Sequence, residues 1–263
     1  MKWENRNRNV WIKAKDIEIG EDVIFGDNIN IEINGTFKIG DYSKLGDNVH
    51  IRGNNVHFGD HLYHSSGLRV GGGGSGGPNA NLTIGDRCTI HNNFLNVCEP
   101  IEIGNDVGLS QEVSLITHGY WGSVLEGYPR KFEGIVIGDN CILGYRTTVL
   151  PGVKIGEGVV VGACSVVTQT YIGGHSIFAG NPAKFIKAIE EPSEEGKISS
   201  LLGILWDYSS EGFEVKYPLV HYKGFSFRVD TSEYYGKETE ETDHLRDYLR
   251  KWGIRIYTKR PFG

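Results

Sequence analysis

One histidine lies in a setting that suits acid–base chemistry. His118, in Thr117-His118-Gly119, belongs to a long loop, THGYWGSVLEGYPRKFEG, that separates two regular stretches of sequence. An imidazole can take a proton from a hydroxyl group at neutral pH, and such a base accelerates a reaction by about 10²- to 10⁴-fold. His118 is therefore a candidate general base; a loop histidine without a role is the alternative. Tyr120 and Trp121 follow directly, and they suit a sugar ring or anchor the loop.

Three other histidines are close enough in sequence to suggest a metal site. His57, His61 and His64 have spacings that a zinc ion could use. They flank a glycine-rich segment, however, and no cysteine or carboxylate pattern accompanies them. We therefore expect no metal, and His118 remains the catalytic candidate among the nine histidines.

Charge and hydropathy argue against several classes of function. The chain has 27 basic and 33 acidic residues, whereas a nucleic-acid partner favours a basic face. The longest apolar stretches, such as residues 201–206, are far shorter than the roughly 20 residues of a transmembrane helix. The N-terminal stretch MKWENRNRNVWIK is charged and has no apolar core, so we expect no secretory signal.

The cysteines indicate a reducing compartment. Cys88, Cys98, Cys141 and Cys164 show no CxxC spacing, and three of them lie where small core residues are expected. Buried thiols are therefore favoured over disulfides or metal ligands. This predicts a cytoplasmic protein.

A six-residue repeat identifies the scaffold that must position the loop. The phrase "aliphatic, any, aliphatic, Gly" recurs from residue 17 onward, usually followed by Asp, Glu or Asn. After the loop the register is kept at every sixth position, at Ile135, Cys141, Thr147, Val153, Val159, Ser165, Tyr171 and Ile177. Such a repeat predicts a parallel β-helix with three faces, about 18 residues per coil and coils about 4.8 Å apart. We expect glycine and asparagine to supply the positive φ of its corners; the alternative, an antiparallel sandwich, does not require so strict a spacing.

The repeat is interrupted twice. Residues 60–81 contain GGGGSGG and predict a flexible excursion that cannot form a coil wall. Residues 114–134 form the loop that carries His118. Long loops on a rigid scaffold tend to hold function, so residues 114–134 are the expected catalytic loop.

The repeat ends after Pro182 and gives way to a different organisation. We expect residues 1–190 to form the β-helix domain, closed by a short helix over 183–190, and residues 195–263 to form a small α+β domain. The pattern of that second domain predicts strands over 213–216, 225–229 and 254–257 and an amphipathic helix over 240–252.

Residues 113–188 carry motifs of a known family. They include ITHGYW, IVIGDNCILG, VLPGVKIGEGVVVGACSVVT and AGNPAKFIKAI. This stretch resembles the hexapeptide-repeat acetyltransferases, and among them the maltose, galactoside and nodulation-factor O-acetyltransferases. The resemblance implies a left-handed β-helix and a homotrimer, with acetyl-CoA and the acceptor meeting in a groove between subunits. It also implies that His118 takes the proton from the acceptor hydroxyl.

The resemblance implies a set of residues on the side of the acetyl-CoA donor. Tyr145 and Ala163 match positions whose backbone binds the pantetheine arm, and Thr168 lies beside them. Lys184 and Lys187 match basic positions near the phosphates of CoA, which suits its anionic tail. A solvated face of the expected terminal helix is the alternative interpretation of the two lysines.

On the acceptor side the resemblance is weaker. Thr89 occupies the position at which the family has an acceptor-binding asparagine, so Asn92 and Asn93 are the nearby candidates. Tyr120 and Trp121 are further candidates because they follow His118. A hydroxyl of a sugar or of a surface-polysaccharide precursor is the expected acceptor.

Three other functions use the same scaffold. An N-acetyltransferase acting on a nucleotide-linked amino sugar would also use a histidine base, and only the motif match favours oxygen over nitrogen. A γ-type carbonic anhydrase would pair histidines five residues apart, but Ser123 lies five residues after His118. A non-catalytic assembly scaffold would not need the histidine loop.

Overall fold

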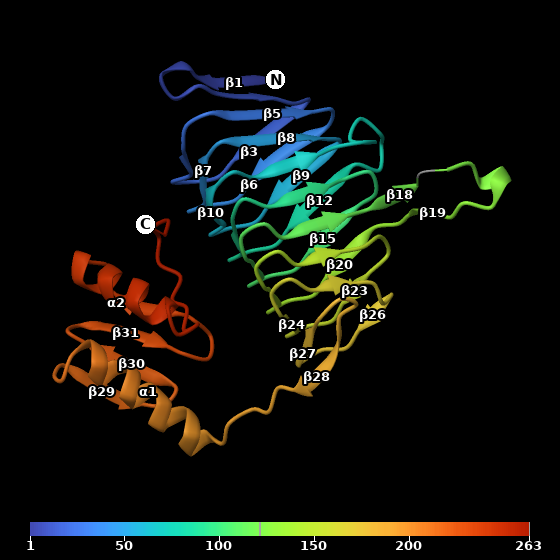
Figure 1. Cartoon of the computed structure of the whole chain (residues 1–263). Coiled ribbons are helices and arrows are strands. Elements are labelled where there is room, and N and C mark those ends of the chain that lie inside the picture. Colours follow the sequence, from blue (N-terminus) through green and yellow to red (C-terminus); the bar gives the residue numbers. More distant parts are fainter. Residues whose placement is uncertain (121, 263) are drawn as a thin grey trace. The chain divides into compact units, whose positions relative to one another are not determined.

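The computed structural model describes residues 1–120 and 122–262 (Figure 1). The chain divides into two compact units, residues 1–189 and 190–263. Each unit has its own hydrophobic core, and each is described by itself.

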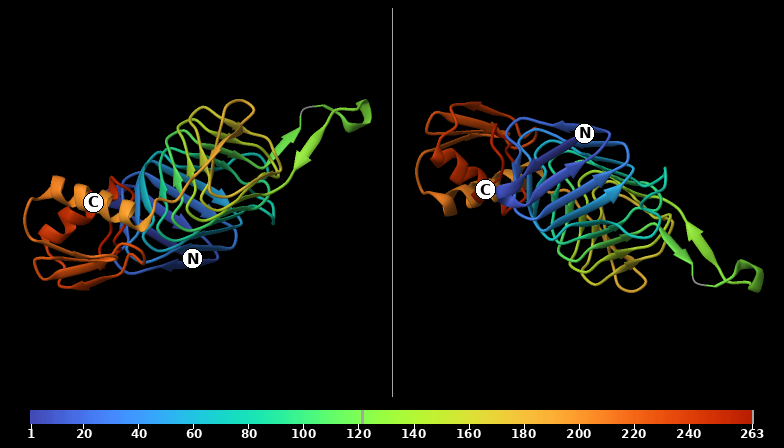
Figure 2. Two further views of the ribbon diagram at one scale, coloured as in Figure 1. Left: turned by 90° about the horizontal axis from the view of Figure 1, so that it is seen from below. Right: turned by 90° about the horizontal axis from the view of Figure 1, so that it is seen from above.

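The first unit is a parallel β-helix with three faces (Figures 1 and 2). Face A contains β2 (Val10–Lys13), β5 (Ile29–Ile33), β8 (Val49–Gly53), β11 (Arg69–Gly71), β14 (Phe94–Asn96), β17 (Ser114–Ile116), β22 (Thr148–Val149) and β25 (Val166–Val167). Face B contains β3 (Asp16–Ile19), β6 (Thr36–Ile39), β9 (Asn55–Phe58), β12 (Asn81–Ile84), β15 (Ile101–Ile103), β20 (Ile135–Ile137), β23 (Lys154–Ile155) and β26 (Tyr171–Ile172). Face C contains β4 (Ile24–Phe25), β7 (Lys44–Asp47), β10 (Tyr63–Ser66), β13 (Thr89–Ile90), β16 (Gly108–Leu109), β21 (Ile142–Leu143), β24 (Val160–Val161) and β27 (Ser176–Ala179).

Two antiparallel strands complete the ends of the helix. β1 (Lys2–Asn5) pairs with β2 and is joined to it by the short 3-10 helix η1 (Arg6–Arg8). β28 (Lys184–Ala188) pairs with β27. These strands cover sheet edges whose N–H and C=O groups would otherwise lack partners in the sheet. The expected parallel β-helix is therefore confirmed.

One inward side chain per strand builds the core. On face A the register aligns a continuous column of buried aliphatic side chains: Ile12, Ile31, Ile51, Val70, Leu95, Leu115, Val149 and Val167. Columns on the other faces are built in the same way. The burial of apolar surface along these columns is the main favourable contribution to folding.

The corners explain why glycine precedes an acidic or amide residue. Asp139 Oδ1 accepts a hydrogen bond of 2.7 Å from the backbone N–H of Asn105, one coil away. A Cβ atom on Gly104 would lie 2.1 Å from the same oxygen, so no larger residue fits. The positive φ lies instead on non-glycine corner residues such as Asn140 and Arg146. The predicted positive φ is therefore found at asparagine but not at glycines such as Gly104, where glycine is needed because the next coil packs too close for a side chain.

Three further predictions in this unit need correction, and the first two concern residues 60–81 and 183–190. Within residues 60–81, β10 and β11 do form coil walls, because Leu62, Leu68 and Val70 are buried inward; only residues 72–80 leave the coil. Residues 184–188 form β28 and not a helix, since they extend face C and Phe185 packs against Phe178 with ring centroids 5.9 Å apart.

The six-residue register, the third of these predictions, shifts in the last coil. Thr148 pairs with Val166, which is one regular coil later in the sequence. Lys154 pairs with Tyr171, so the coil that begins at Lys154 is one residue shorter than the regular coil. Ile172 and Phe178 are buried, although the period predicted Tyr171 and Ile177. The side chain of Tyr171 lies outside what the structure describes.

The second unit is a small α+β fold. It contains α1 (Glu194–Tyr208), β29 (Phe213–Lys216), β30 (Leu219–Tyr222), β31 (Phe225–Arg228), β32 (Tyr234–Gly236) and α2 (Glu240–Arg250). The four strands form an antiparallel sheet in sequence order. The expected strands over 213–216 and 225–229 and the helix over 240–252 agree with β29, β31 and α2. Residues 254–257 are not a strand, because Ile256 packs into the core without pairing to the sheet.

No helix within the described residues is long and apolar enough to cross a membrane.

A buried histidine makes stability depend on pH. His64 lies in the inward column of face C between Leu45 and Ile90, and it is 0% exposed. Neither ring nitrogen has a hydrogen-bond partner among the described residues, and burial lowers the pKa of His64 to about 4. Because the unfolded chain binds this proton near pH 6.5, the free energy of unfolding should fall between pH 6.5 and about 4, by up to about 1.4 kcal/mol per pH unit. Urea unfolding of wild type and His64→Leu at pH 7 and pH 5 tests this: the variant should lose less stability, and equal losses would contradict it.

Candidate active site

Three excursions from the β-helix lie at the same corner. Corner AB, the turn from face A to face B, is formed in successive coils by residues 72–80, 97–100 and 117–134. They follow β11, β14 and β17, which are neighbours in face A. The glycine-rich segment and the histidine loop are well separated in sequence and are thus brought together by the stacking of coils.

The predicted catalytic loop is a β-hairpin. β18 (His118–Tyr120) and β19 (Arg130–Phe132) form a two-stranded antiparallel ribbon that projects from the β-helix (Figure 2), with the 3-10 helix η2 (Val124–Glu126) at its tip. His118 lies opposite Phe132, and Tyr120 lies opposite Arg130. Directly opposed residues share one face of an antiparallel ribbon.

The side chains on this face stack on one another. The ring centroids of His118 and Phe132 are 5.5 Å apart, and those of Tyr120 and Phe132 are 5.6 Å apart. The guanidinium carbon of Arg130 lies 5.9 Å from the centroid of Phe132. We call this set of four side chains the hairpin ladder. It places a base, two aromatic rings and a cation in a row.

One amide holds the imidazole of His118. Nδ1 of His118 lies 2.7 Å from Oδ1 of Asn96. Asn96 is only 4% exposed, and its Nδ2 donates to the backbone oxygen of Gly71 at 3.1 Å. This second bond orients the amide so that its oxygen faces His118. Nδ1 therefore carries the proton, and Nε2 is left with the lone pair that a general base needs.

A buried threonine fixes the end of the hairpin that joins the β-helix. Oγ1 of Thr117 donates to the backbone oxygen of Asn96 at 2.7 Å and accepts from the backbone N–H groups of Cys98 and Glu99. Thr117 is 0% exposed. These bonds join the hairpin to the preceding coil at the point where His118 leaves it, so the imidazole is held by a rigid element.

The free nitrogen of His118 faces the glycine-rich segment. Nε2 has no hydrogen-bond partner in the part of the chain that the structure describes. A Cβ atom on Gly73 would lie 3.3 Å from Nε2 and 3.4 Å from Cε1. Glycine at position 73 thus keeps the approach to Nε2 open.

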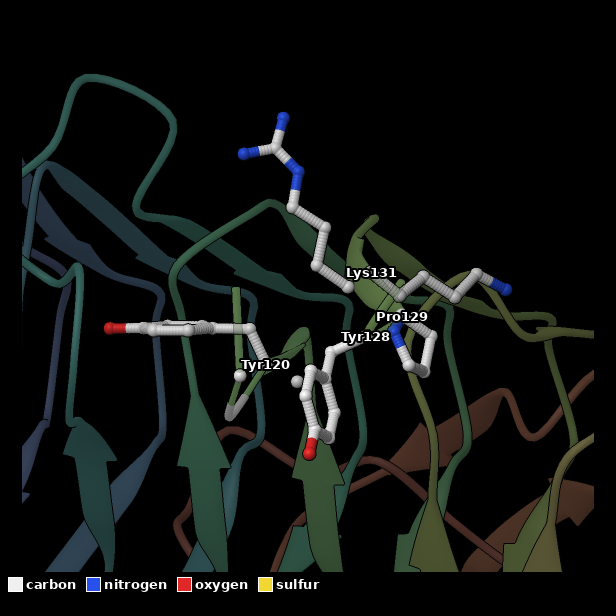
Figure 3. Close-up of a pocket in the computed structure, with 7 residues that line it drawn as sticks. Tyr120, Tyr128, Pro129 and Lys131 are labelled. Atoms are coloured by element: carbon white, nitrogen blue, oxygen red, sulfur yellow. The ribbon is translucent and has the colours of Figure 1, made fainter. Parts of the chain in front are cut away.

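A hollow lies on the outer part of the hairpin (Figure 3). It has a volume of about 560 Å³ and is lined by Tyr120 of β18, by Lys131 of β19, and by Tyr128 and Pro129, which precede β19. In Figure 3 the ring of Tyr120 and the side chain of Lys131 point in opposite directions, as expected for opposite faces of the ribbon. Lys131 is paired with Glu133 at 3.3 Å on its own face.

The predicted acceptor residues have different surroundings. Tyr120 lies in the hairpin ladder, and Trp121 lies outside the described residues. Asn93 is buried in another corner, where Nδ2 donates to the oxygen of Ser110 and Oδ1 accepts from the N–H of His91. These bonds occupy both ends of its amide, so its position does not fit a contact with an acceptor. Asn92 is exposed beside it.

The predicted donor residues do not lie next to His118. Tyr145 and Ala163 are in corner CA, the turn from face C to face A, where the backbone N–H of Cys164 donates to the oxygen of Tyr145. The hydroxyl of Tyr145 donates to Glu112. About six residues, or roughly 20 Å of extended chain, separate corner CA from corner AB in one coil. A single copy therefore keeps Tyr145 and Ala163 apart from His118.

The remaining donor candidates lie nearer the end of the β-helix. Thr168 is exposed in corner AB, the corner of His118, and Lys184 and Lys187 are exposed on β28.

Glu112 of corner CA is bound by Arg146 at 2.6 Å, and this contact lowers the pKa of its carboxyl. Two of the cysteines, Cys88 and Cys141, are buried.

No cluster of three or more histidine, cysteine or acidic residues within residues 1–120 and 122–262 could hold a metal ion. Of the three histidines considered above, His64 points into the core of face C, and His57 lies on β9 of face B. They do not converge on one point.

Comparisons with known proteins decide the family. Residues 134–169 match the family described as "Bacterial transferase hexapeptide (six repeats)". The Escherichia coli K12 protein named "Putative lipopolysaccharide biosynthesis O-acetyl transferase WbbJ" is 34% identical over 146 residues, covering 50% of this chain and 71% of WbbJ. The chain belongs to the hexapeptide-repeat acetyltransferases. The resemblance in residues 113–188 is thereby confirmed.

The chain is also similar to other acetyltransferases. The Bacillus subtilis protein named "Putative acetyltransferase YvoF" is 33% identical over 102 residues, covering 39% of this chain and 56% of YvoF. The chain thus spans about half the length of YvoF. The crystal structure of the hexapeptide-repeat acetyltransferase VCA0836 from Vibrio cholerae is 24% identical, covers 51% of this chain and 74% of that one, and has a TM-score of 0.42. A TM-score this low adds nothing to the family assignment.

Two residues of the candidate site were missed in the sequence. Asn96 is hydrogen-bonded to His118, Gly73 leaves room beside its Nε2, and neither residue lies in a family motif. The length of one coil could have indicated Asn96. Phe94 pairs with Ser114, so this coil is close to the regular length. Asn96 and His118 therefore follow neighbouring strands of face A and lie at the same corner in adjacent coils. The position of Gly73 depends on the course of the excursion, which no repeat describes.

The contact with Asn96 gives a prediction about positioning. Asn96→Ala should lower kcat about 10-fold, the value of one neutral hydrogen bond, while the KM for acetyl-CoA stays unchanged. A purely structural role would instead lower the melting temperature and affect kcat and KM together. Steady-state kinetics with thermal unfolding of the same samples separates the two.

Proposed function

We propose that the protein is an acetyl-CoA-dependent O-acetyltransferase that modifies a hydroxyl group of a sugar or a surface-polysaccharide precursor, with His118 as general base. The observation that carries this proposal is the hydrogen bond between His118 and Asn96. It holds the imidazole in the tautomer whose Nε2 is basic, at the opening between the hairpin and the glycine-rich segment. Membership of the acetyltransferase family supplies the reaction class.

The chemistry follows from this geometry. Nε2 of His118 takes the proton from the acceptor hydroxyl as its oxygen attacks the thioester carbonyl carbon of acetyl-CoA. The tetrahedral intermediate collapses, the carbon–sulfur bond breaks, and the thiolate of CoA leaves. The imidazolium of His118 returns the proton to that thiolate, so the base is regenerated. A backbone N–H group is the expected donor to the oxyanion.

The donor contacts support a homotrimer as part of the proposal. Tyr145 and Ala163 would bind the pantetheine arm and Lys184 and Lys187 the phosphates. Because corner CA lies away from His118 within one copy, a site shared by two copies would bring these groups together. Mass determination in solution tests this part, and a monomer with full activity would refute it.

The acceptor and the compartment belong to the proposal as well. The name of WbbJ, "Putative lipopolysaccharide biosynthesis O-acetyl transferase", supports a hydroxyl on a surface glycan over an amino sugar. A protein that consumes acetyl-CoA must work where CoA is made, which agrees with the cytoplasmic prediction from the cysteines.

One assay separates the alternatives. CoA release from acetyl-CoA is measured with sugars, oligosaccharides and nucleotide-linked amino sugars as acceptors. We expect release with hydroxyl acceptors. Release with amino sugars alone would establish N-acetylation, and a chain that neither binds CoA nor releases it would be a scaffold.

A further inference from the structure

The hairpin ladder ends in a cation that the proposed chemistry does not use. Arg130 is exposed at the outer end of the ladder, opposite Tyr120. Among the described residues no carboxylate pairs with it, although the neighbouring Lys131 is neutralised by Glu133. Arg130 thus presents a free positive charge on the same face as the catalytic imidazole.

The spacing along the ladder suits one sugar unit. Residues two apart on a strand are about 7 Å apart, so Arg130 and Tyr120 lie about one such step beyond the pair of His118 and Phe132. Between base and cation the faces of Phe132 and Tyr120 offer apolar surface to the C–H groups of a sugar ring. A ligand along the ladder therefore meets a base, an aromatic surface and a guanidinium in that order.

We infer that the acceptor is an acidic sugar, whose carboxylate or phosphate is bound by Arg130 while one of its hydroxyl groups reaches Nε2 of His118. A guanidinium binds either anion through two parallel hydrogen bonds, and this geometry orients the ligand as well as attracting it. The inference rests on the proposed O-acetyltransferase function and adds the charge of the substrate.

CoA carries anions of the same chemistry, so its phosphates are a second possible source. An anion on the acceptor and the phosphates of CoA can be told apart, because Arg130 would then affect the KM for the acceptor or the KM for acetyl-CoA. Acceptor binding affects the kinetics of the acidic acceptor alone, and CoA binding affects the KM for acetyl-CoA with every acceptor.

The test uses matched acceptors and matched variants. CoA release is measured with D-glucuronic acid and glucose 6-phosphate against D-glucose, for wild type, Arg130→Gln and Lys131→Gln. Lys131 is the control because it is adjacent, carries the same charge and lies on the opposite face of the ribbon. We expect wild type to prefer an acidic sugar at least about 10-fold in kcat/KM, and Arg130→Gln to lose about 10- to 100-fold with that sugar only.

The outcomes separate the inference from the proposed function. Lys131→Gln should stay within about twofold of wild type, and added salt should slow the reaction with acidic sugars more than the reaction with glucose. Preference for glucose, or a higher KM for acetyl-CoA in Arg130→Gln, would overturn the inference and leave the acetyltransferase intact. If no acceptor of either charge stimulates CoA release in wild type, the proposed function fails and the inference with it.

Discussion

Replacing His118 with alanine is expected to lower kcat by about 10²- to 10⁴-fold and to leave the affinity for acetyl-CoA unchanged. The loss corresponds to removal of a general base, which contributes this much when it is positioned against the attacking group. The variant should fold, because His118 lies on the projecting hairpin and the buried columns of the β-helix do not depend on it. CoA release, calorimetric CoA binding and thermal unfolding measure the three quantities.

A second histidine serves as the control for His118. His221 also makes one hydrogen bond through a ring nitrogen, since its Nδ1 lies 2.6 Å from Oγ of Ser226. It lies on β30 in the second unit. His221→Ala should retain the kcat of wild type. A His118→Ala variant that keeps more than about half of the wild-type kcat would show that another group removes the proton.

The β-helix could be predicted because each coil obeys the same local rule. One inward aliphatic residue per strand and a glycine before each acidic corner repeat along the chain, so the period itself encodes the architecture. The errors lie where that rule ends. In β28 the sequence AKFIKA favours a helix on propensity, but the open edge of face C pairs with it as a strand.

The site was predictable only in part, because its contacts join different coils. His118 stands in a motif, whereas Asn96 and Gly73 reach it through the stacking of three successive coils. That stacking depends on insertions of unequal length: Arg69 pairs with Phe94 and Ser114 pairs with Thr148, and both spans exceed a regular coil by different amounts. A fixed period cannot place residues across such insertions, so the orienting amide was found only in the structure.

Gly73→Ala should lower activity strongly without unfolding the protein. The added Cβ would lie 3.3 Å from Nε2 of His118, in the space where an acceptor hydroxyl must come within about 3 Å of that nitrogen. Displacing the hydroxyl by about 1 Å costs on the order of 100-fold, so kcat/KM for the acceptor should fall by about that factor. The φ of Gly73 lies outside the left-handed range, and the close contact of the added Cβ is with the imidazole on the projecting hairpin, so we expect the variant to fold.

Gly76→Ala provides the matched control within the same segment. A Cβ atom at position 76 meets nothing within 4 Å, and its φ also lies outside the left-handed range. Its activity should equal that of wild type, and its free energy of unfolding should rise by about 0.4–1 kcal/mol. A loss of activity in a folded Gly73→Ala variant, with no loss in Gly76→Ala, places the acceptor at Nε2. Full activity of Gly73→Ala means that the acceptor reaches His118 from another side, and the approach past the glycine-rich segment is then wrong.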